Sequence, residues 1–417
     1  MSVPSSVLAS MDVVRSWQED LYRDLHQHPE LSHHEHATSE KVATRLEQTG
    51  YQVHTGVGGT GVVGVLRNGA GPTVLMRADM DALPVEETTG LAYASTVVAT
   101  DDDGVQVPVA HACGHDMHVA CLLGAAQLLA DGAEHWHGTV VTLFQPAEES
   151  GDGARAMVDD DLATLVPTPD VALAQHVLPG PAGHIGTRSG PTFSAADSLR
   201  ITVFGRGGHG SMPQATIDPV VLAAMIVIRL QTVVSRETSP GDTVVLTIGS
   251  IQAGTKSNII PERAVLLLNV RTYSEQIRTA VLAAIRRIVD AECLASGSPR
   301  PAELELFDRF PLTDNDDAAT RRVAAAFSDF FGDRAEPMRQ QTASEDFSDI
   351  PTALGTPYTY WGIGCSDRER YRQAADDGRI AQDIPVNHAG SFAPTLQPTL
   401  DTGTQALVVA ALGWLAP

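Results

Sequence analysis

Two short runs of the sequence carry side chains that could do chemistry together. The first run is His111-Ala-Cys-Gly-His-Asp-Met-His118, and the second, further along the chain, is Gln145-Pro-Ala-Glu-Glu149. Thiolate, imidazole and carboxylate groups are the usual ligands of zinc, and they also accept manganese, cobalt or nickel. The two runs therefore predict most of a divalent-metal site of the kind that hydrolases use.

Five residues are candidate metal ligands. Cys113 and His115 are separated by one glycine, which lets both side chains face one ion from a loop. Glu149 and His176 each follow a separate apolar run, and His388 lies in a later loop. Five ligands suit two metal ions with one bridging group, and such a pair polarises a substrate carbonyl.

The neighbouring residues Glu148 and Glu149 can take different roles because their side chains diverge. If Glu149 binds metal, Glu148 stays free beside the reacting water as general base and later as general acid. Asp81 could orient Glu148 or a ligand. Adjacent glutamates usually mark a solvated helix start, but an apolar run and a proline precede this pair. The catalytic interpretation is therefore favoured.

The predicted elements place these candidates at the ends of strands. Apolar runs at 73–78, 139–144 and 171–175 are typical of buried strands, and site-like residues follow each of them. In α/β sheets, ligands bind outside the carboxyl ends of the strands. We therefore expect an α/β catalytic domain with a largely parallel core. Its other expected elements are helices at 9–29, 38–49 and 115–131 and strands at 51–57 and 61–67.

A second, smaller domain is predicted over residues 190–307. Its element order is β-α-β-β-α-β, the order of a ferredoxin-like domain. The expected strands are 199–204, 243–249, 264–271 and 302–307, and the expected helices are 218–235 and 274–296. Because more site-like residues occur at 340–417, the chain is expected to return to the first domain. Residues 1–189 and 308–417 then form one discontinuous catalytic domain around an inserted satellite domain.

Other histidines are weaker candidates. Five of them crowd into residues 26–36, namely His26, His28, His33, His34 and His36. Their spacing is that of a surface helix end and loop, so a structural or solvated role is favoured. His111 and His118 flank the metal motif, and a role near the site stays open for both. The glycine-rich run around His209 lacks the Lys-Ser/Thr ending of a phosphate loop and instead allows close backbone approach.

Composition limits the partners. The net charge of −23 repels phosphate backbones and anionic lipid, so no nucleic-acid or membrane partner is expected. The four cysteines form no Cys-x-x-Cys pair, which favours a reducing, cytoplasmic compartment. The first thirteen residues lack the basic and apolar regions of a signal peptide. The apolar run at 406–415 is too short to span a bilayer.

Several short motifs follow one another in order along nearly the whole chain. They are His28-Pro-Glu-Leu-Ser32, Arg77-Ala-Asp-Met-Asp-Ala-Leu-Pro84, His111-Ala-Cys-Gly-His-Asp116, Gln145-Pro-Ala-Glu-Glu149, Gly207-Gly-His-Gly-Ser211, Ser257-Asn-Ile-Ile-Pro261 and Ser344-Glu-Asp-Phe347. This ordered set resembles the dinuclear-metal aminoacylase/carboxypeptidase hydrolases. Within them it is similar to the branch of hippurate hydrolase, auxin-conjugate hydrolases and bacterial N-acyl-amino-acid amidohydrolases. The resemblance implies a zinc-peptidase-like catalytic domain with an inserted satellite domain.

The resemblance also implies roles for single residues. The metal ligands match Cys113, His115, Glu149, His176 and His388, the general base matches Glu148, and the acid that orients the base or a ligand matches Asp81. His209 matches a histidine that reaches into the partner subunit and supports the tetrahedral oxyanion. Asn258 and Arg271 match positions that help hold the substrate carboxylate, with a strand-end salt bridge as the alternative for Arg271. Relatives outside this branch carry His at the position of Asp79, so Asp79 is not among the predicted ligands.

These expectations combine in a metal-dependent amidohydrolase with two divalent ions per subunit. It would cleave N-acyl-L-amino acids into a carboxylic acid and a free amino acid, with Glu148 activating water and His209 helping to stabilise the oxyanion. A dipeptidase or carboxypeptidase with the same site is the alternative. A binding protein on a degenerate scaffold is disfavoured by the intact Glu148. A homodimer is expected, because the inserted domain can pair across a two-fold axis.

Overall fold

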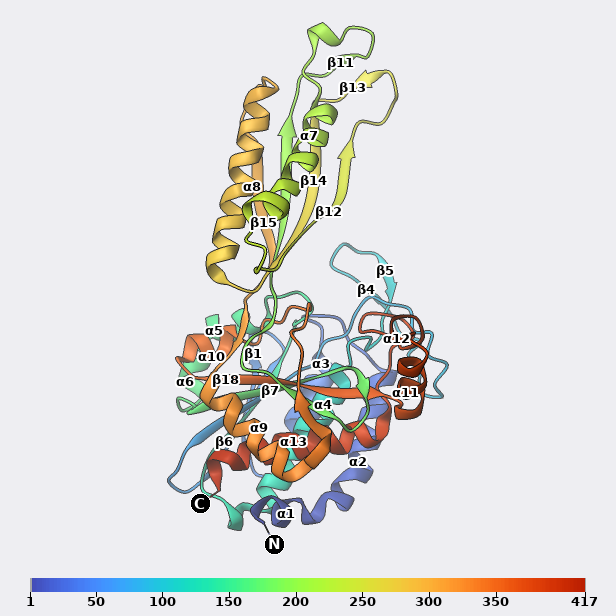
Figure 1. Cartoon of the computed structure of the whole chain (residues 1–417). Coiled ribbons are helices and arrows are strands. Elements are labelled where there is room, and N and C mark those ends of the chain that lie inside the picture. The colour runs from blue at the N-terminus through green and yellow to red at the C-terminus, as the bar shows by residue number, and fades with distance from the viewer. Residues whose placement is uncertain (1, 417) are drawn as a thin grey trace. The chain divides into compact units, whose positions relative to one another are not determined.

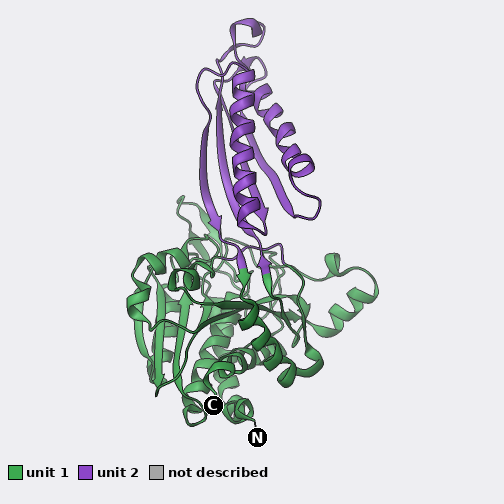
Figure 2. Ribbon diagram, turned by 60° about the vertical axis from the view of Figure 1, so that its left-hand side comes forward, with its two compact units in different colours: residues 1–190, 314–340, 346–417 green, residues 191–313, 341–345 purple. Residues whose placement is uncertain are grey.

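The computed structural model describes residues 2–416, which divide into two compact units (Figure 2). Unit 1 comprises Met1–Gly190, Asp314–Gln340 and Asp346–Pro417, and unit 2 comprises Pro191–Thr313 and Gln341–Glu345. Unit 2 is thus inserted into unit 1 along the chain. The short segment 341–345 belongs to unit 2, a feature that no sequence pattern indicated. Residues 1 and 417, the ends of the predicted catalytic domain, lie outside the described residues.

Unit 1 is built on a mixed sheet with a parallel centre (Figure 1). In spatial order its strands are β1 (Gln52–Val57), β2 (Gly61–Asn68), β6 (Gly138–Gln145), β3 (Thr73–Asp79), β7 (Val171–Pro181), β18 (Tyr358–Ser366), β8 (Ile185–Thr187) and β17 (Ala335–Pro337). The four strands β6, β3, β7 and β18 run parallel, whereas β1 and β2 pair antiparallel. Strands β3 and β6 are buried along their whole length, as parallel strands covered on both faces are.

One helix at the centre of unit 1 carries part of the predicted metal motif. Helix α4 (His115–Asp131) contacts β3 and packs against α2 (Met11–Gln27) and α13 (Leu396–Leu415). Almost all of its side chains are buried. At Gly124 an added Cβ would lie 1.8 Å from the amide nitrogen of Gln18, which donates to the Ala120 carbonyl at 2.8 Å. The close approach of α2 to α4 therefore requires a glycine there.

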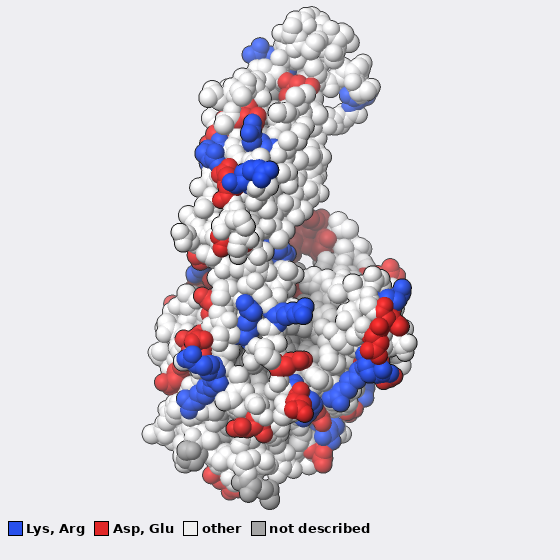
Figure 3. Space-filling model, viewed as in Figure 1, with Lys and Arg blue, Asp and Glu red and all other residues white. Residues whose placement is uncertain are grey.

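The remaining elements of unit 1 are short or peripheral. The helices are α1 (Val3–Val7), α3 (His36–Gln48), α5 (Gly153–Asp159), α6 (Leu162–Leu165), α9 (Asp317–Phe331), α10 (Asp349–Leu354), α11 (Arg368–Asp376) and α12 (Ile380–Asp383), and the strands are β4 (Val98–Thr100) and β5 (Gln106–Pro108). On the face shown in Figure 3, acidic and basic side chains of unit 1 are interspersed, with no single large basic patch among the residues drawn in colour.

Unit 2 has the predicted ferredoxin-like order. Its elements are β10 (Ala195–Phe204), α7 (Pro219–Thr232), β12 (Val244–Ala253), β14 (Arg263–Thr272), α8 (Glu275–Ala295) and β15 (Glu303–Phe310), with the short strands β11 (Gly208–His209) and β13 (Ile259–Ile260). The short strands β9 (Gly190–Phe193) and β16 (Thr313–Asn315) lie where the chain passes from one unit to the other. The sheet order is β12-β14-β10-β15, and all pairs are antiparallel. Helices α7 and α8 lie side by side against this sheet (Figure 1). The predicted fold class, an α/β domain with an inserted α+β domain, is confirmed.

Helix α7 is apolar on both of its faces, whereas a surface helix is usually apolar only on the face that it buries. It continues as a π-helical turn to Glu237, and the whole stretch Pro219–Glu237 is long and apolar enough, by length and composition alone, to cross a membrane. The buried face includes Leu222, Ile226 and Leu230 and packs on the sheet. The other face leaves large apolar side chains exposed, namely Val220, Val221, Met225 and Ile228. The apolar composition therefore reflects two apolar faces, of which the sheet covers one.

Candidate metal centre and active site

The Cys-Gly-His part of the first motif forms the start of α4. Gly114 has φ of +87°, and an added Cβ there would lie 2.5 Å from the Val177 side chain. The glycine therefore allows the left-handed turn and the close approach to β7 together. It leaves Cys113 in the loop before the helix and His115 as the first helical residue, both buried.

Asp81 fixes the orientation of His115 and the backbone of Glu149. Its Oδ1 lies 3.0 Å from His115 Nδ1, and its Oδ2 accepts from the Ser32 hydroxyl at 2.7 Å and from the Glu149 amide at 3.0 Å. His115 Nε2 consequently faces the carboxylates of Glu148 and Glu149, each at 3.8 Å. Burial lowers the pKa of His115, but Asp79 and Asp81 outweigh it and raise that pKa to about 10. A cation at Nε2 would displace this proton.

His176 and Cys113 face each other across the same space. His176 Nδ1 donates to the Val177 carbonyl at 2.8 Å, which leaves Nε2 directed at the Cys113 sulfur 3.4 Å away. Burial lowers the pKa of His176 well below its usual value, so its ring is a neutral ligand. Burial, Glu149 and Glu148 raise the pKa of the Cys113 thiol. A thiol in that condition must release its proton in order to bind metal.

Glu149 belongs to two overlapping groups of potential ligand atoms. One group joins it to Cys113 and His388, and the other joins it to His115 and Glu148, with all ligand atoms in each group within 4.8 Å of one another. His388 Nε2 lies 3.4 Å from Glu149 Oε2. Two buried atoms, His115 Nε2 and Glu149 Oε1, have no hydrogen-bond partner among the described residues. Orphaned acceptor and imidazole atoms in one place fit divalent cations.

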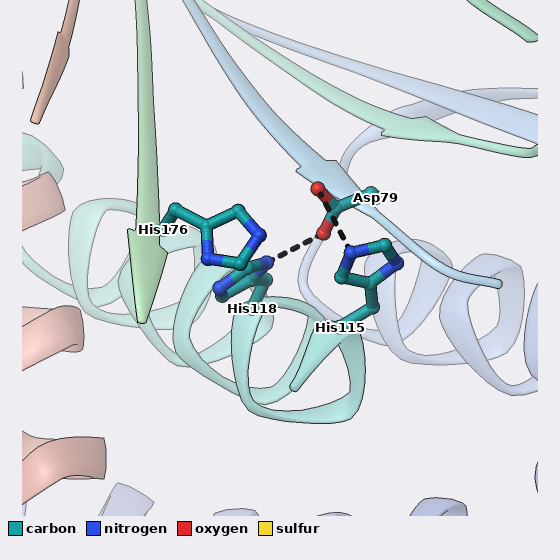
Figure 4. Close-up of side chains that lie close together, drawn as sticks. All are labelled: Asp79, His115, His118 and His176. Atoms are coloured by element: carbon teal, nitrogen blue, oxygen red, sulfur yellow. Dashed lines mark hydrogen bonds and ion pairs between the residues drawn. The ribbon is translucent and has the colours of Figure 1, made fainter. Parts of the chain in front are cut away.

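His118 lies closer to the site than its flanking position suggested (Figure 4). Its Nδ1 donates to Asp79 at 2.5 Å, and its Nε2 accepts from the Val177 amide at 2.9 Å. The potential ligand atoms of Asp79, His115, His118 and His176 therefore lie within 4.8 Å of one another, which is close enough to surround a metal ion. Both ring nitrogens of His118 are already engaged, however, so this histidine braces β3 against β7 and has no atom left for a metal.

A buried guanidinium beneath the site was missed by sequence reasoning. Arg77 donates to Gln145 Oε1 at 2.9 Å, to Asp79 at 2.6 Å and to Asp346 at 3.3 Å. Asp346 also accepts from the Gln145 amide at 2.6 Å and from the Ala154 backbone at 2.9 Å. Both charged residues lie in quoted motifs, yet nothing in their spacing showed that they are buried together.

The three predicted site residues of unit 2 fall into two places. His209 pairs with Ile259 across β11 and β13, and the Gly210 amide donates to the Asn258 carbonyl, so His209 and Asn258 are neighbours just before β14 begins. Arg271 lies near the other end of β14, roughly 25 Å further on at about 3.3 Å per residue. There it donates to the Thr342 carbonyl at 2.8 Å and to the Ser344 hydroxyl at 3.1 Å. Their functional roles stay predictions.

Residues 75–383 match the family described as peptidase family M20/M25/M40. The chain belongs to this family. Thermostable carboxypeptidase 2 of Saccharolobus solfataricus is 38% identical over 76% of this chain and 78% of its own length. N-acetylcysteine deacetylase of Bacillus subtilis is 36% identical over 79% of this chain and 83% of its own length. The resemblance drawn from the motifs is thereby confirmed.

A solved structure extends the likeness to both units of this M20-family chain. It is the YxeP protein of Bacillus subtilis, described as a dinuclear metal-binding peptidase of the M20 family. The TM-score is 0.76 and the identity 28%, over 96% of this chain and 99% of that one.

The five histidines near the N-terminus are solvated or structural, as expected, and His26 is the one with a structural role. His28, His33, His34 and His36 are exposed, but His26 is buried between Asp116, 2.6 Å from Nδ1, and Glu87, 3.1 Å from Nε2. Burial lowers the pKa of His26, and the two carboxylates more than reverse this, so that it reaches about 10. A buried imidazolium therefore contacts Asp116 in the first turn of α4, directly after the candidate ligand His115.

This ion pair predicts a pH-dependent stability. Because the folded pKa of His26 exceeds the unfolded value of about 6.5, its stabilisation is complete below pH 6.5 and is lost as pH rises through about 10. We expect His26→Gln to lower the free energy of unfolding by about 3–5 kcal/mol at pH 6, because two buried carboxylates lose their partner. The difference should shrink towards pH 10. Urea denaturation measures it, with His28→Gln as the exposed control, and a difference that is constant with pH would contradict the assignment.

Proposed function

We propose that this chain is a metal-dependent amidohydrolase that cleaves N-acyl-L-amino acids into a carboxylic acid and a free amino acid. The observation that carries the proposal is the position of Glu148, a buried carboxylate grouped with His115 and Glu149 beside the orphaned ligand atoms. N-acetylcysteine deacetylase, an M20 relative, is named for the same kind of bond cleavage.

The residues that would hold two divalent ions are Cys113, His115, Glu149, His176 and His388. Zinc, manganese, cobalt and nickel all suit this mixture of sulfur, nitrogen and oxygen ligands. When bound, the ions polarise the substrate carbonyl and compensate negative charge as it develops. Asp81 holds His115 and the Glu149 backbone, which keeps these two ligands oriented.

Glu148 moves the proton. It takes a proton from the water whose oxygen attacks the amide carbon, and it gives that proton to the nitrogen as the carbon–nitrogen bond breaks. The Glu148 side chain is only slightly exposed, so few water molecules compete for this proton. His209 supports the oxyanion, while Asn258 and Arg271 hold the substrate carboxylate.

A homodimer accounts for the separation of these last residues. Within one unit 2, His209 and Asn258 lie at the opposite end of β14 from Arg271, so one subunit cannot direct all three at one small substrate. A partner subunit that contributes His209 and Asn258 removes this difficulty. The exposed apolar face of α7 and the edge strand β12 form the surface that would meet the partner.

A cytoplasmic location is the compartment that fits the thiols. All four cysteines are unpaired and buried, as in a protein kept in a reducing environment.

Replacing the general base gives the direct test. Glu148→Gln keeps the shape of the side chain but cannot accept the proton, so kcat should fall by about two to four orders of magnitude with metal content unchanged. Glu149→Gln is the matched neighbour and should instead lose metal. Activity and metal content are measured on the same purified samples. A metal-loaded Glu148→Gln enzyme that works at the wild-type rate would show that the mechanism is wrong.

The alternative substrate class is a peptide, favoured by the likeness to a thermostable carboxypeptidase. The same catalytic groups would serve, and only the pocket would differ. We expect kcat/KM to be higher for N-acetyl amino acids than for dipeptides of the same amino acid when manganese, zinc, cobalt and nickel are supplied in turn. Mass spectrometry of the products makes the comparison, and the reverse ranking would favour a peptidase.

The dimer is tested on the exposed face of α7. Met225→Asp and Ile228→Asp place charges where two apolar faces would meet, so the native mass should fall from a dimer to a monomer. Activity should fall with it, because His209 no longer reaches a partner. Val98→Asp, which changes an exposed apolar residue of unit 1, is the control and should stay dimeric. A fully active monomeric wild type would contradict both the dimer and the role of His209.

A further inference from the structure

We propose that Glu35 is a positioning residue that holds the turn carrying Glu148 and Glu149 in its active conformation. The proposal deepens the proposed function and rests on it for the roles of these two glutamates. Glu35 lies in the tract His33-His34-Glu35-His36, whose three histidines are exposed, yet Glu35 itself is fully buried. A buried carboxylate within a solvated tract needs partners inside the protein.

Those partners are all hydrogen-bond donors. Glu35 Oε1 accepts from the backbone amide of Ala147 at 2.8 Å and from that of His33 at 3.0 Å. Glu35 Oε2 accepts from the Thr60 hydroxyl at 2.5 Å. An ionised carboxylate is an acceptor only, and here it satisfies donors from three separate segments of unit 1.

Two of these donors belong to residues with left-handed backbone. Ala147 has φ of +51° and His33 has φ of +65°, values that L side chains rarely adopt. Such conformations persist only where the surroundings over-determine them. The Ala147 amide is buried, so without Glu35 it would lose its acceptor. Because Ala147 directly precedes Glu148, its backbone angles set the direction in which both glutamates leave the turn.

Two carboxylates hold the turn, Glu35 at the amide of Ala147 and Asp81 at the amide of Glu149. Both depend on the segment 32–35. Asp81 accepts the Glu149 amide and is itself bound by the Ser32 hydroxyl, three residues before Glu35. Inside the turn, the Gly151 amide donates to the Glu148 carbonyl at 2.8 Å and the Gly153 amide to the Ala147 carbonyl at 3.2 Å. These local bonds close the turn, but within residues 2–416 the acceptor for the amide of Ala147 is Glu35.

The test measures manganese affinity as well as turnover. Loss of partners around metal ligands typically lowers affinity or activity about 10- to 100-fold. We therefore expect Glu35→Ala to weaken Mn²⁺ binding by about that factor, through Glu149, and to lower kcat more than it raises KM, through Glu148. Glu35→Gln should stay near wild type, because its amide oxygen still accepts from Ala147 while its amide nitrogen donates to Thr60.

Two further variants separate positioning from folding. Glu30→Ala is the matched control: the Glu30 carboxylate accepts the Ala37 and Thr38 amides at 2.9 and 2.8 Å, at the start of α3. It should lower the melting temperature and leave Mn²⁺ affinity unchanged. The double variant Glu35→Ala/Ala147→Gly should recover part of the lost affinity, because glycine adopts positive φ without strain.

The outcomes are distinct. Wild-type Mn²⁺ affinity in a folded Glu35→Ala would overturn the proposal, and so would an equal loss in Glu35→Gln. If Glu35→Ala does not fold, Glu35→Asp takes its place, because it keeps the charge but moves the oxygens back by one methylene. Weaker Mn²⁺ binding by Glu35→Asp would support the proposal, and wild-type binding would overturn it. Titration calorimetry reads this affinity without substrate. Failure of Glu148 as the base, seen as an active Glu148→Gln, is therefore recognised separately.

Discussion

A single buried guanidinium is the constraint on which the rest of the site depends. Arg77 is withdrawn from water, and Asp79, Asp346 and Gln145 stabilise its charge by accepting its hydrogen bonds. These acceptors come from β3, from the end of β6 and from the segment that re-enters unit 1 at residue 346. Satisfying one cation thus fixes the mutual register of three segments that are distant in the sequence.

Hydrogen bonds connect this guanidinium to the segments that carry the candidate metal ligands. Asp79 accepts a hydrogen bond from His118, and the other ring nitrogen of His118 accepts one from the amide of Val177, next to His176. Gln145 ends β6, and the turn that bears the two glutamates follows it directly. The buried network therefore places the backbone on which the candidate ligands His176 and Glu149 lie, while Asp81 and Glu35 add direct contacts to His115 and to the turn of the two glutamates. Metal sites are commonly tuned by such outer contacts.

The sequence predicted what depends on local pattern and missed what depends on burial. Apolar runs located β3 and β6 closely and placed Gln145 at a strand end, because strand residues buried on both faces are apolar throughout. His176 was expected just after its strand, but β7 continues past it to Pro181. Glu35 and His26 could not be found in this way, since a charged residue in a histidine-rich tract carries no sign of being buried. The separation of Asn258 from Arg271 is likewise a property of the folded sheet of unit 2.

The thiol at Cys113 has one more consequence. With its pKa raised by burial and by two neighbouring carboxylates, the sulfur of the metal-free site carries a proton at neutral pH. Protonated sulfur is a poor nucleophile, so the raised pKa slows the reaction of this thiol with oxidants. If Cys113 binds metal, as predicted, this proton must leave, and metal binding becomes stronger as the medium becomes more alkaline. Acidity and metal binding are therefore coupled at this sulfur, as they are at His115, whose pKa is also raised.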